Sequence, residues 1–213
     1  MKFIGVNGGT FDPIHYGHLR PALEVYQQLG LDHVRFVPCY KPVHREQPQA
    51  NGKLRCEMIA AAIRYQDAFE LDTFEMEQPG PSYMVHTLLA LKQHFQQDSL
   101  VLMMGTDAFA KFHTWHDWER ILDLANIAVM HRPGEPVPVE SESGVIYQAH
   151  HVDQLTKQNG QIVDVAVTQL DISSTNIKEH LQRGDSVEYL LPPSVTNFIE
   201  QQGLYKDPLK KRI

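Results

Sequence analysis

Two histidines follow a pair of glycines near the start of the chain, and their types and spacing suit phosphate chemistry. The glycines are Gly8 and Gly9, and the histidines are His15 and His18, three residues apart. Adjacent glycines allow a phosphate to approach the backbone closely, and side chains at this spacing at a helix start lie on the same side. Two imidazoles beside such a turn can stabilise the charge of a phosphoryl-type transfer.

This turn is not one of the common nucleotide-binding fingerprints. The chain has no Gly-x-Gly-x-x-Gly followed by an acid after the second strand, and no Gly-Lys-Ser/Thr of a P-loop. An alternative is that the glycines only make a tight turn and the histidines cap a helix. The sequence Gly-Gly-Thr-Phe-Asp-Pro in front of the histidines favours the phosphate-binding interpretation.

A run of hydroxyl side chains opens a predicted helix late in the chain. The run is Ile172-Ser173-Ser174-Thr175, and Lys178 follows one turn later. Hydroxyl groups at a helix start either cap its amides or bind phosphate oxygens. The residues alone leave both interpretations open.

A third candidate segment, Gly105-Thr106-Asp107, ends an unbroken apolar run that is typical of a central parallel strand. In an open α/β sheet, ligands bind outside the carboxyl ends of the strands, where the strand order reverses. If the order is 3-2-1-4-5, this segment and the glycine turn meet at that crevice. Asp107 could then accept ribose hydroxyls, or it could cap a helix.

A basic loop and a pair of tryptophans are weaker candidates. His44 and Arg45 follow the second predicted strand, where a basic loop can close over phosphates or be merely solvated. Trp115 and Trp118 stand three residues apart in a predicted helix, a spacing typical of packing. The segment from His113 to Asp117 contains a His-Asp pair, as in metal-dependent phosphohydrolases, but the alternation of strands and helices argues against their all-helical fold.

Strand-like and helix-like segments alternate along the chain, which predicts an α/β fold: a Rossmann-like open parallel sheet with helices on both faces. The predicted strands are 3–6, 34–37, 69–74, 100–104, 127–130 and 163–168, with one more near 145–147 in an exposed excursion over 132–161. The predicted helices are 17–29, 53–65, 82–95 capped by Ser82, 115–124, 174–183, 187–191 and 194–202. We expect a single domain over 1–213, with an α/β core over roughly 1–170 and a small helical part over 171–213.

The composition favours a protein that binds small anionic ligands. The 213 residues are 42% hydrophobic and carry a net charge of −7, without the basic face that a nucleic acid polymer needs. No apolar stretch approaches the roughly 18 residues of a membrane span, and the N-terminus has no signal peptide, so the expected compartment is the cytoplasm. Cys39 and Cys56 match neither a disulfide framework nor a zinc spacing.

Taken together, these motifs resemble the nucleotidylyltransferase superfamily, whose His-x-Gly-His signature is met here as His15-Tyr16-Gly17-His18. Within it the chain is similar, from Phe3 to Tyr205, to the bacterial nicotinate-nucleotide adenylyltransferases. Tyr83 and Trp115 at their spacings indicate this branch. Lys178 stands where the family usually has Arg, which keeps the charge and loses the bidentate fork, and Met84 stands where it often has Thr.

The resemblance implies transfer of AMP from ATP to nicotinate mononucleotide, giving nicotinate adenine dinucleotide and pyrophosphate, a step of NAD biosynthesis. It implies that His15 and His18 are catalytic. The implied ATP-binding residues are Gly8, Gly9, Thr10, Phe11, His15, His18, Gly105, Asp107, Ile172, Ser173, Ser174, Thr175 and Lys178. The implied residues for nicotinate mononucleotide are Asp12, His44, Arg45, Tyr83, Met84, Thr87, Asp107, Trp115 and Arg132.

The resemblance also implies partners and a cofactor. Mg²⁺ is expected to arrive with ATP and to keep mostly water and phosphate ligands, without a metal site of the protein's own. ATP and nicotinate mononucleotide are the expected partners, with no nucleic acid polymer and no membrane, in a monomer or small homo-oligomer. Two alternatives remain: a nucleotidylyltransferase for nicotinamide mononucleotide or phosphopantetheine, and a nucleotide-binding regulator without catalysis.

Overall fold

The computed structural model describes residues 1–42, 47–78, 80–135 and 140–206. Within these ranges the strands form one six-stranded sheet in the order β3-β2-β1-β4-β5-β6, and every neighbouring pair is parallel. The strands are β1 (Phe3–Gly9), β2 (His33–Pro38), β3 (Phe69–Leu71), β4 (Ser99–Gly105), β5 (Ala125–His131) and β6 (Ile162–Ala166). The expected Rossmann-like sheet is confirmed, and its order reverses between β1 and β4.

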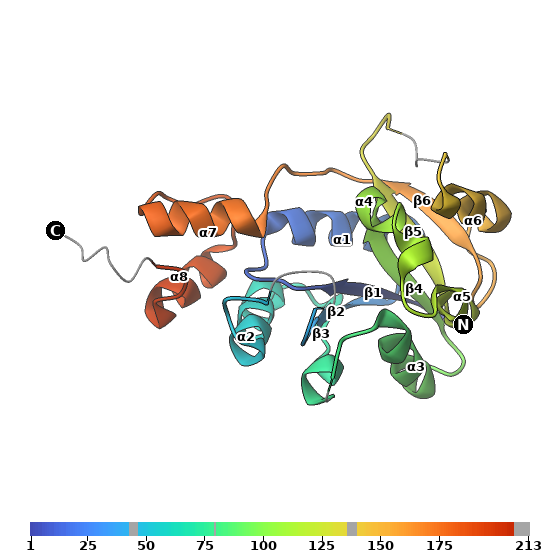
Figure 1. Cartoon of the computed structure of the whole chain (residues 1–213), viewed down its shortest axis with the longest axis horizontal. Coiled ribbons are helices and arrows are strands. Elements are labelled where there is room, and N and C mark those ends of the chain that lie inside the picture. Colours follow the sequence, from blue (N-terminus) through green and yellow to red (C-terminus); the bar gives the residue numbers. More distant parts are fainter. Residues whose placement is uncertain (43–46, 79, 136–139, 207–213) are drawn as a thin grey trace.

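Helices connect these strands and complete the C-terminal part (Figure 1). The α-helices are α1 (Tyr16–Leu29), α2 (Gly52–Ile63), α3 (Met84–His94), α4 (Thr106–Phe109), α5 (Trp118–Leu124), α6 (Glu142–His150), α7 (Ser174–Arg183) and α8 (Pro193–Gln202). The short 3₁₀ helices are η1 (Phe74–Glu77) and η2 (Phe112–Thr114). No helix in the described ranges is long and apolar enough to cross a membrane.

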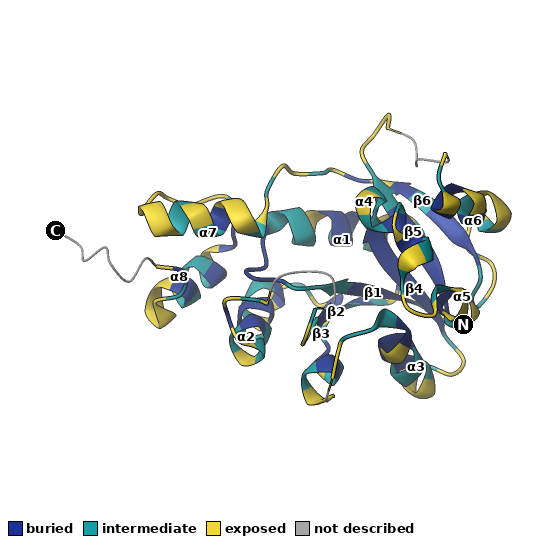
Figure 2. Cartoon of the chain, viewed as in Figure 1, coloured by how far each residue is buried: buried dark blue, intermediate teal, exposed yellow. Residues whose placement is uncertain are grey.

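Two apolar clusters cover the two faces of the sheet. On one face Val25 of α1 and Met58 of α2 pack with Met103 of β4, and the cluster extends to Ile177 of α7 and Ile199 of α8. The other cluster is formed by side chains of α3, α5 and α6 against the opposite face of β1, β4 and β5. The strands are therefore buried on both faces, and the outer surfaces of the helices face solvent (Figure 2).

Helix α8 packs against α2, and α7 lies beside α8 at the left end of the molecule, away from the strands (Figure 1). The Ser194 hydroxyl donates to the Ala61 carbonyl of α2 at 2.8 Å, and Val195 of α8 is fully buried. Helix α7 has the bounds that the sequence predicts: Ser173 caps its first turn and Gly184 ends it in the left-handed conformation.

Two sequence predictions of secondary structure are wrong because local chemistry overrides the apolar pattern. The strand expected near 145–147 lies inside α6, whose start is capped by the Ser141 hydroxyl and whose Val145 points outward at 67% exposure. The helix expected over 187–191 is a turn instead. There Tyr189 has a φ of 64°, and the two prolines that follow disfavour a helix before them.

Three further differences concern helix starts and a strand end. The expected helix over 115–124 begins only at Trp118, since Trp115 has an extended backbone and Asp117 a left-handed one. Ser82 is not the cap of α3. Tyr83 occupies that position, and the Ser82 hydroxyl accepts from the Tyr40 and Lys41 amides. Strand β3 ends at residue 71, and the rest of the predicted strand 69–74 turns into η1.

Asn126 connects the starts of β4 and β6 through β5. Its side chain is fully buried. It donates to the Ser99 hydroxyl and to the Lys157 carbonyl, both at 2.9 Å, and accepts from the Gln161 amide at 2.8 Å. A buried amide with these partners satisfies polar groups that no apolar side chain can satisfy.

We expect N126A to lower the free energy of unfolding by about 3 kcal/mol or more, because it leaves several buried polar groups without partners. Urea denaturation would measure the change. The control is N51A, which removes a solvent-facing cap of α2 and should cost about 1 kcal/mol. A loss in N126A no larger than that of N51A would contradict the prediction.

Candidate active site

The turn between β1 and α1 is closely packed, which explains its two glycines. A Cβ at Gly8 would lie 2.5 Å from Met84 Cε, and one at Gly9 would lie 2.9 Å from the ring of Phe11. Phe11 has a φ of 51° and is buried. The turn therefore brings the backbone of β1 against the start of α3 and anchors itself with the Phe11 ring.

His15 and His18 face the same side at the start of α1, as their spacing predicts. Their rings are stacked with centroids 3.7 Å apart, and the His15 amide donates to His18 Nδ1 at 3.3 Å. A ring nitrogen that accepts a hydrogen bond carries no proton, so neutral His18 holds its proton on Nε2. Such an N–H can donate to a phosphate oxygen.

His15 is the more deeply buried of the pair. It is 4% exposed, and its Nδ1 has no hydrogen-bond partner among the described residues. Burial lowers the pKa of His15 to about 4. A Cβ at Gly17 would lie 2.9 Å from this ring and 3.1 Å from the Ile172 carbonyl oxygen, so a glycine is required where α1 passes the segment before α7.

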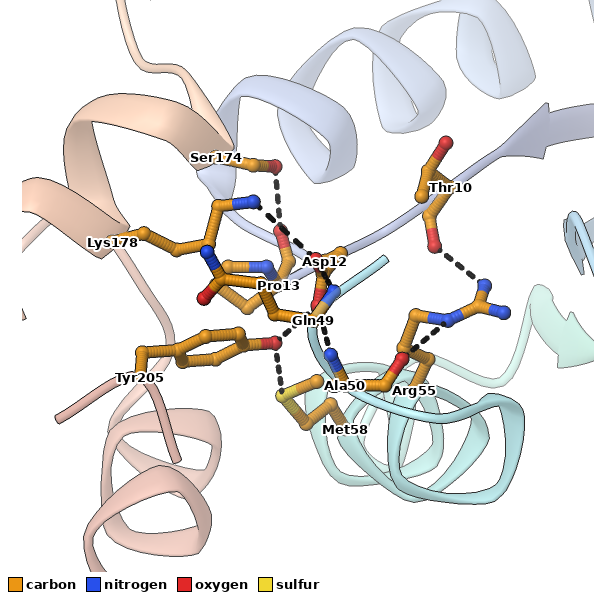
Figure 3. Close-up of polar contacts among 10 residues, drawn as sticks. All are labelled: Thr10, Asp12, Pro13, Gln49, Ala50, Arg55, Met58, Ser174, Lys178 and Tyr205. Atoms are coloured by element: carbon orange, nitrogen blue, oxygen red, sulfur yellow. Dashed lines mark hydrogen bonds and ion pairs between the residues drawn. The ribbon is translucent and has the colours of Figure 1, made fainter. Parts of the chain in front are cut away.

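The Asp12 carboxylate joins the first turn to three other parts of the chain (Figure 3). Oδ1 accepts from the Tyr205 hydroxyl at 2.6 Å and the Ala50 amide at 3.1 Å. Oδ2 accepts from the Gln49 amide at 2.9 Å and pairs with Lys178 Nζ at 3.3 Å. Burial, with Asp12 as hydrogen-bond acceptor, raises the pKa of Tyr205. Asp12 is thus a buried junction rather than a free ligand.

Two further side chains hold the same turn (Figure 3). Arg55 is 1% exposed, and it donates to the Thr10 carbonyl at 2.8 Å and the Ala50 carbonyl at 3.2 Å. The Ser174 hydroxyl donates to the Pro13 carbonyl at 3.0 Å. The hydroxyl run before α7 therefore has mixed roles: Ser173 caps the helix, Ser174 holds the turn, and Thr175 is exposed.

A cavity of about 220 Å³ lies at the carboxyl ends of the central strands, as the strand order predicts. Its lining includes Asn7, Gly17, His18, Gly105, Met130 and Gln169. Arg132 Nε donates to Gln169 Oε1 at 3.1 Å, so Arg132 belongs to this side of the site. Asp107 is exposed in the first turn of α4, whose cap position is held by Gly105.

A second cavity, of about 180 Å³, lies between η1 and the start of α3. Its lining includes Phe74, Glu75, Ser82, Tyr83, His86 and Thr87. The ring of Tyr83 lies 4.3 Å from that of His116 and 5.7 Å from that of His86. The cavity therefore combines aromatic rings with one buried carboxyl group.

Four expected site residues remain, of which the structure describes Trp115 and Met84. Trp115 is half-buried with its ring edge-on to Phe112 at 5.9 Å, and Met84 contacts the Gly8 position. His44 and Arg45 lie outside the described residues. Sequence reasoning missed Glu75, His86, Gln169, Arg55 and Tyr205. Of these only His86, one turn after Tyr83, carries a spacing signal that could have found it.

The side chains around the first turn bear on how a metal ion could be bound in this site. Within the described ranges no three His, Cys, Asp or Glu side chains are grouped to hold an ion, and the carboxylate at the first turn, Asp12, already accepts from four donors. Mg²⁺ commonly binds through substrate phosphates and water with few protein ligands. A Mg²⁺ ion held by phosphate oxygens and water is compatible with these residues.

The sheet, the switch-point cavity and the stacked histidines define a nucleotidyltransferase of Rossmann-like fold. The family model of the cytidylyltransferase-like proteins matches residues 6–180. A Hydrogenovibrio crunogenus protein named "Probable nicotinate-nucleotide adenylyltransferase" is 56% identical over 205 residues, 96% of this chain and 98% of that protein. A Methylococcus capsulatus protein of the same name is 42% identical over 207 residues, 95% of this chain and 99% of its own. The chain belongs to the cytidylyltransferase-like family and, within it, to the nicotinate-nucleotide adenylyltransferases.

Solved structures agree with this fold at low sequence identity. The Plasmodium falciparum nicotinic acid mononucleotide adenylyltransferase complexed with APC has a TM-score of 0.72 at 17% identity, over 96% of this chain and 98% of that one. The same protein complexed with NaAD has a TM-score of 0.71 at 16% identity over the same shares. The likeness covers nearly the whole length of both chains.

We expect the His15 ring to titrate near pH 4 in the free protein, in a histidine NMR titration. Because the folded pKa lies below the ordinary 6.5, the unfolded chain binds the extra proton between these values, so stability is present above pH 6.5 and falls as pH drops toward 4. This difference between the folded and the ordinary pKa of His15 corresponds to roughly 3 kcal/mol in the free energy of unfolding. H15Q should lose this part of the pH dependence. A His15 resonance that titrates near 6.5 would refute it.

Proposed function

We propose that this protein transfers AMP from ATP to nicotinate mononucleotide, giving nicotinate adenine dinucleotide and pyrophosphate in NAD biosynthesis. The observation that carries the proposal is the stacked His15–His18 pair beside the cavity at the switch point. The close relatives, named as nicotinate-nucleotide adenylyltransferases over nearly the full chain, support the same reaction. The expected alternatives lack a comparable observation in their favour.

The reaction needs positioning and charge stabilisation rather than a general base. A phosphate oxygen of the mononucleotide attacks the α-phosphorus of ATP in line and forms a new P–O bond, while the bond to the leaving pyrophosphate breaks. The attacking phosphate is already anionic, so no side chain has to remove a proton. The catalytic contribution of the protein is then alignment of the two substrates and donors for the oxygens of the transferred group.

The two histidines have different parts in this scheme. His18 donates from Nε2 to an oxygen of the transferred phosphoryl group, because its Nδ1 is occupied by the His15 amide. His15 is held neutral by burial in the free protein. An arriving polyanion raises its pKa and turns the ring into a second donor to the phosphates. The amides of Gly8 to Thr10 complete the phosphate contacts.

The cavity of about 220 Å³ is the proposed site of the ATP nucleoside. Gly105 allows the base to approach the end of β4, and Asp107 accepts from ribose hydroxyls. Ser174 and Lys178 flank the triphosphate with the other residues of their motif: Ile172, Ser173 and Thr175. Lys178 is 20% exposed and paired with Asp12, so it can offer a second N–H to a phosphate without leaving that partner.

The cavity of about 180 Å³ is the proposed site of the nicotinate ring, next to Tyr83, Met84 and Trp115. The contacts of Asp12 favour an indirect role, in which it holds the turn that the acceptor phosphate approaches. Arg132 is assigned to the ATP side through Gln169. Thr87 acts through Glu75, to which its hydroxyl donates. His44 and Arg45 remain proposed phosphate contacts.

Mg²⁺ supplies charge neutralisation to the triphosphate when it is bound. The ion is proposed to arrive with ATP, held by phosphate oxygens and water. We place the reaction in the cytoplasm, where ATP is made available to biosynthetic enzymes.

We expect H18A to lower turnover by a few hundredfold while the far-UV circular dichroism stays unchanged, since one such donor contributes roughly 2.7–4 kcal/mol to the transition state. Pyrophosphate release from ATP and nicotinate mononucleotide measures it. H94A, at the exposed end of α3, is the matched control and should retain full activity. Near-normal turnover of folded H18A would remove His18 from the mechanism.

The function itself is tested by a panel of acceptors with the wild-type protein. We expect kcat/KM to be highest for nicotinate mononucleotide and much lower for nicotinamide mononucleotide, because unpaired amides at the start of α3 favour an anion and leave the donor of a carboxamide without a partner. Phosphopantetheine should give no product. Equal values for acid and amide would overturn the assigned acceptor, and no pyrophosphate with any acceptor would favour a regulator.

A further inference from the structure

Glu75 is a buried carboxyl group to which the proposed reaction assigns no part of the substrate. It is 7% exposed and lies in the 3₁₀ helix η1, on the wall of the cavity of about 180 Å³. Oε1 accepts from the Thr87 hydroxyl at 2.6 Å, whereas Oε2 is buried and has no hydrogen-bond partner in the described ranges. Burying such an oxygen without a partner is costly.

No positive side chain in the described ranges compensates this group. The ion pairs among the described residues involve other carboxylates, and the side-chain bond that Glu75 makes there comes from a neutral hydroxyl. A buried carboxylate is normally paired with a cation. A buried carboxyl group in the wall of a cavity is instead suited to a ligand that brings the positive charge with it.

The other walls of this cavity indicate what kind of cation fits. Phe74, Tyr83 and His86 line it, and His116 lies against the Tyr83 ring. Aromatic rings together with a carboxylate are the usual surroundings of quaternary nitrogen cations, which have no N–H to donate. A quaternary cation needs ring faces and a nearby negative charge, and this cavity has both, beside the polar side chains of Gln78, Ser82 and Thr87.

We propose that Glu75 supplies the counter-charge for the quaternary pyridinium nitrogen of the acceptor and so selects an N-ribosyl pyridinium over a neutral ring of the same shape. This inference rests on the proposed function. It divides the two charges of the nicotinate ring between neighbouring elements. The amides at the start of α3, where Tyr83 is the cap, face the ring carboxylate, and Glu75 faces the ring nitrogen.

The test compares two acceptors that differ in one atom. One is nicotinate mononucleotide. The other is the C-riboside 1-(3-carboxyphenyl)ribose 5′-phosphate, in which carbon replaces the ring nitrogen, so that the ring is neutral while the carboxylate, ribose and phosphate are kept. We expect the wild-type protein to bind the isostere about tenfold more weakly, as measured by calorimetry. The isostere lacks the positive charge, and the interaction of a desolvated cation with aromatic rings and a carboxylate is of this order. Equal dissociation constants in the wild type overturn the proposal without any variant.

Three variants assign the preference to Glu75. E75Q should weaken nicotinate mononucleotide about tenfold, leave the isostere nearly unchanged and bring the ratio close to one. E75D keeps the charge and should retain most of the preference. E77Q removes an exposed charge from the same 3₁₀ helix and should change neither constant.

The outcomes separate this inference from the proposed function. If the wild type makes no nicotinate adenine dinucleotide, the function fails. If it does, and folded E75Q keeps the preference, or if E75Q weakens both acceptors equally, the role of Glu75 as counter-charge is wrong. Should E75Q not fold, the wild-type ratio of dissociation constants and E75D still decide. E75D keeps the negative charge, so a folded E75D that loses the preference for nicotinate mononucleotide contradicts the proposal.

Discussion

The Asp12 carboxylate is the interaction on which the arrangement of the site depends. It is buried, and a buried carboxylate is stable only when donors surround it. Its donors come from the segment before α2, from α7 and from the C-terminal Tyr205. Satisfying one side chain of the first turn therefore brings together segments from both ends of the chain. The stacked histidines begin three residues later, so the contacts of Asp12 also fix where they lie.

Around that junction, β1 separates two chemically different cavities. Asn7 lines the cavity that contains His18 and Gly105, whereas the adjacent Gly8 contacts the start of α3, where Tyr83 lines the other. Successive residues of a strand point to opposite faces, so two neighbouring positions of β1 lie toward the two cavities. In the proposed reaction these cavities hold the two nucleotides, which are joined through their phosphates.

Local patterns predicted the fold well and the site in part. The apolar run of β4 and the hydroxyl-to-glycine bounds of α7 are local signals, and both were confirmed. The strand near 145–147 and the helix over 187–191 failed because a serine cap and a left-handed Tyr189 outweighed the apolar pattern. Glu75 was out of reach of such reasoning, since its meaning depends on the Thr87 hydroxyl and on a cavity that only the folded chain creates.

The bond between Asp12 and Tyr205 spans 193 positions, and this has a consequence for synthesis in the cell. A ribosome makes the first turn early, together with the strand that carries it. Its last donor, Tyr205, is synthesised 193 positions later. A nascent chain can thus form most of its sheet while the buried acid still lacks its C-terminal partner. A product truncated just before Tyr205 would keep the signature motif in its sequence and lose the hydroxyl group that donates to Asp12.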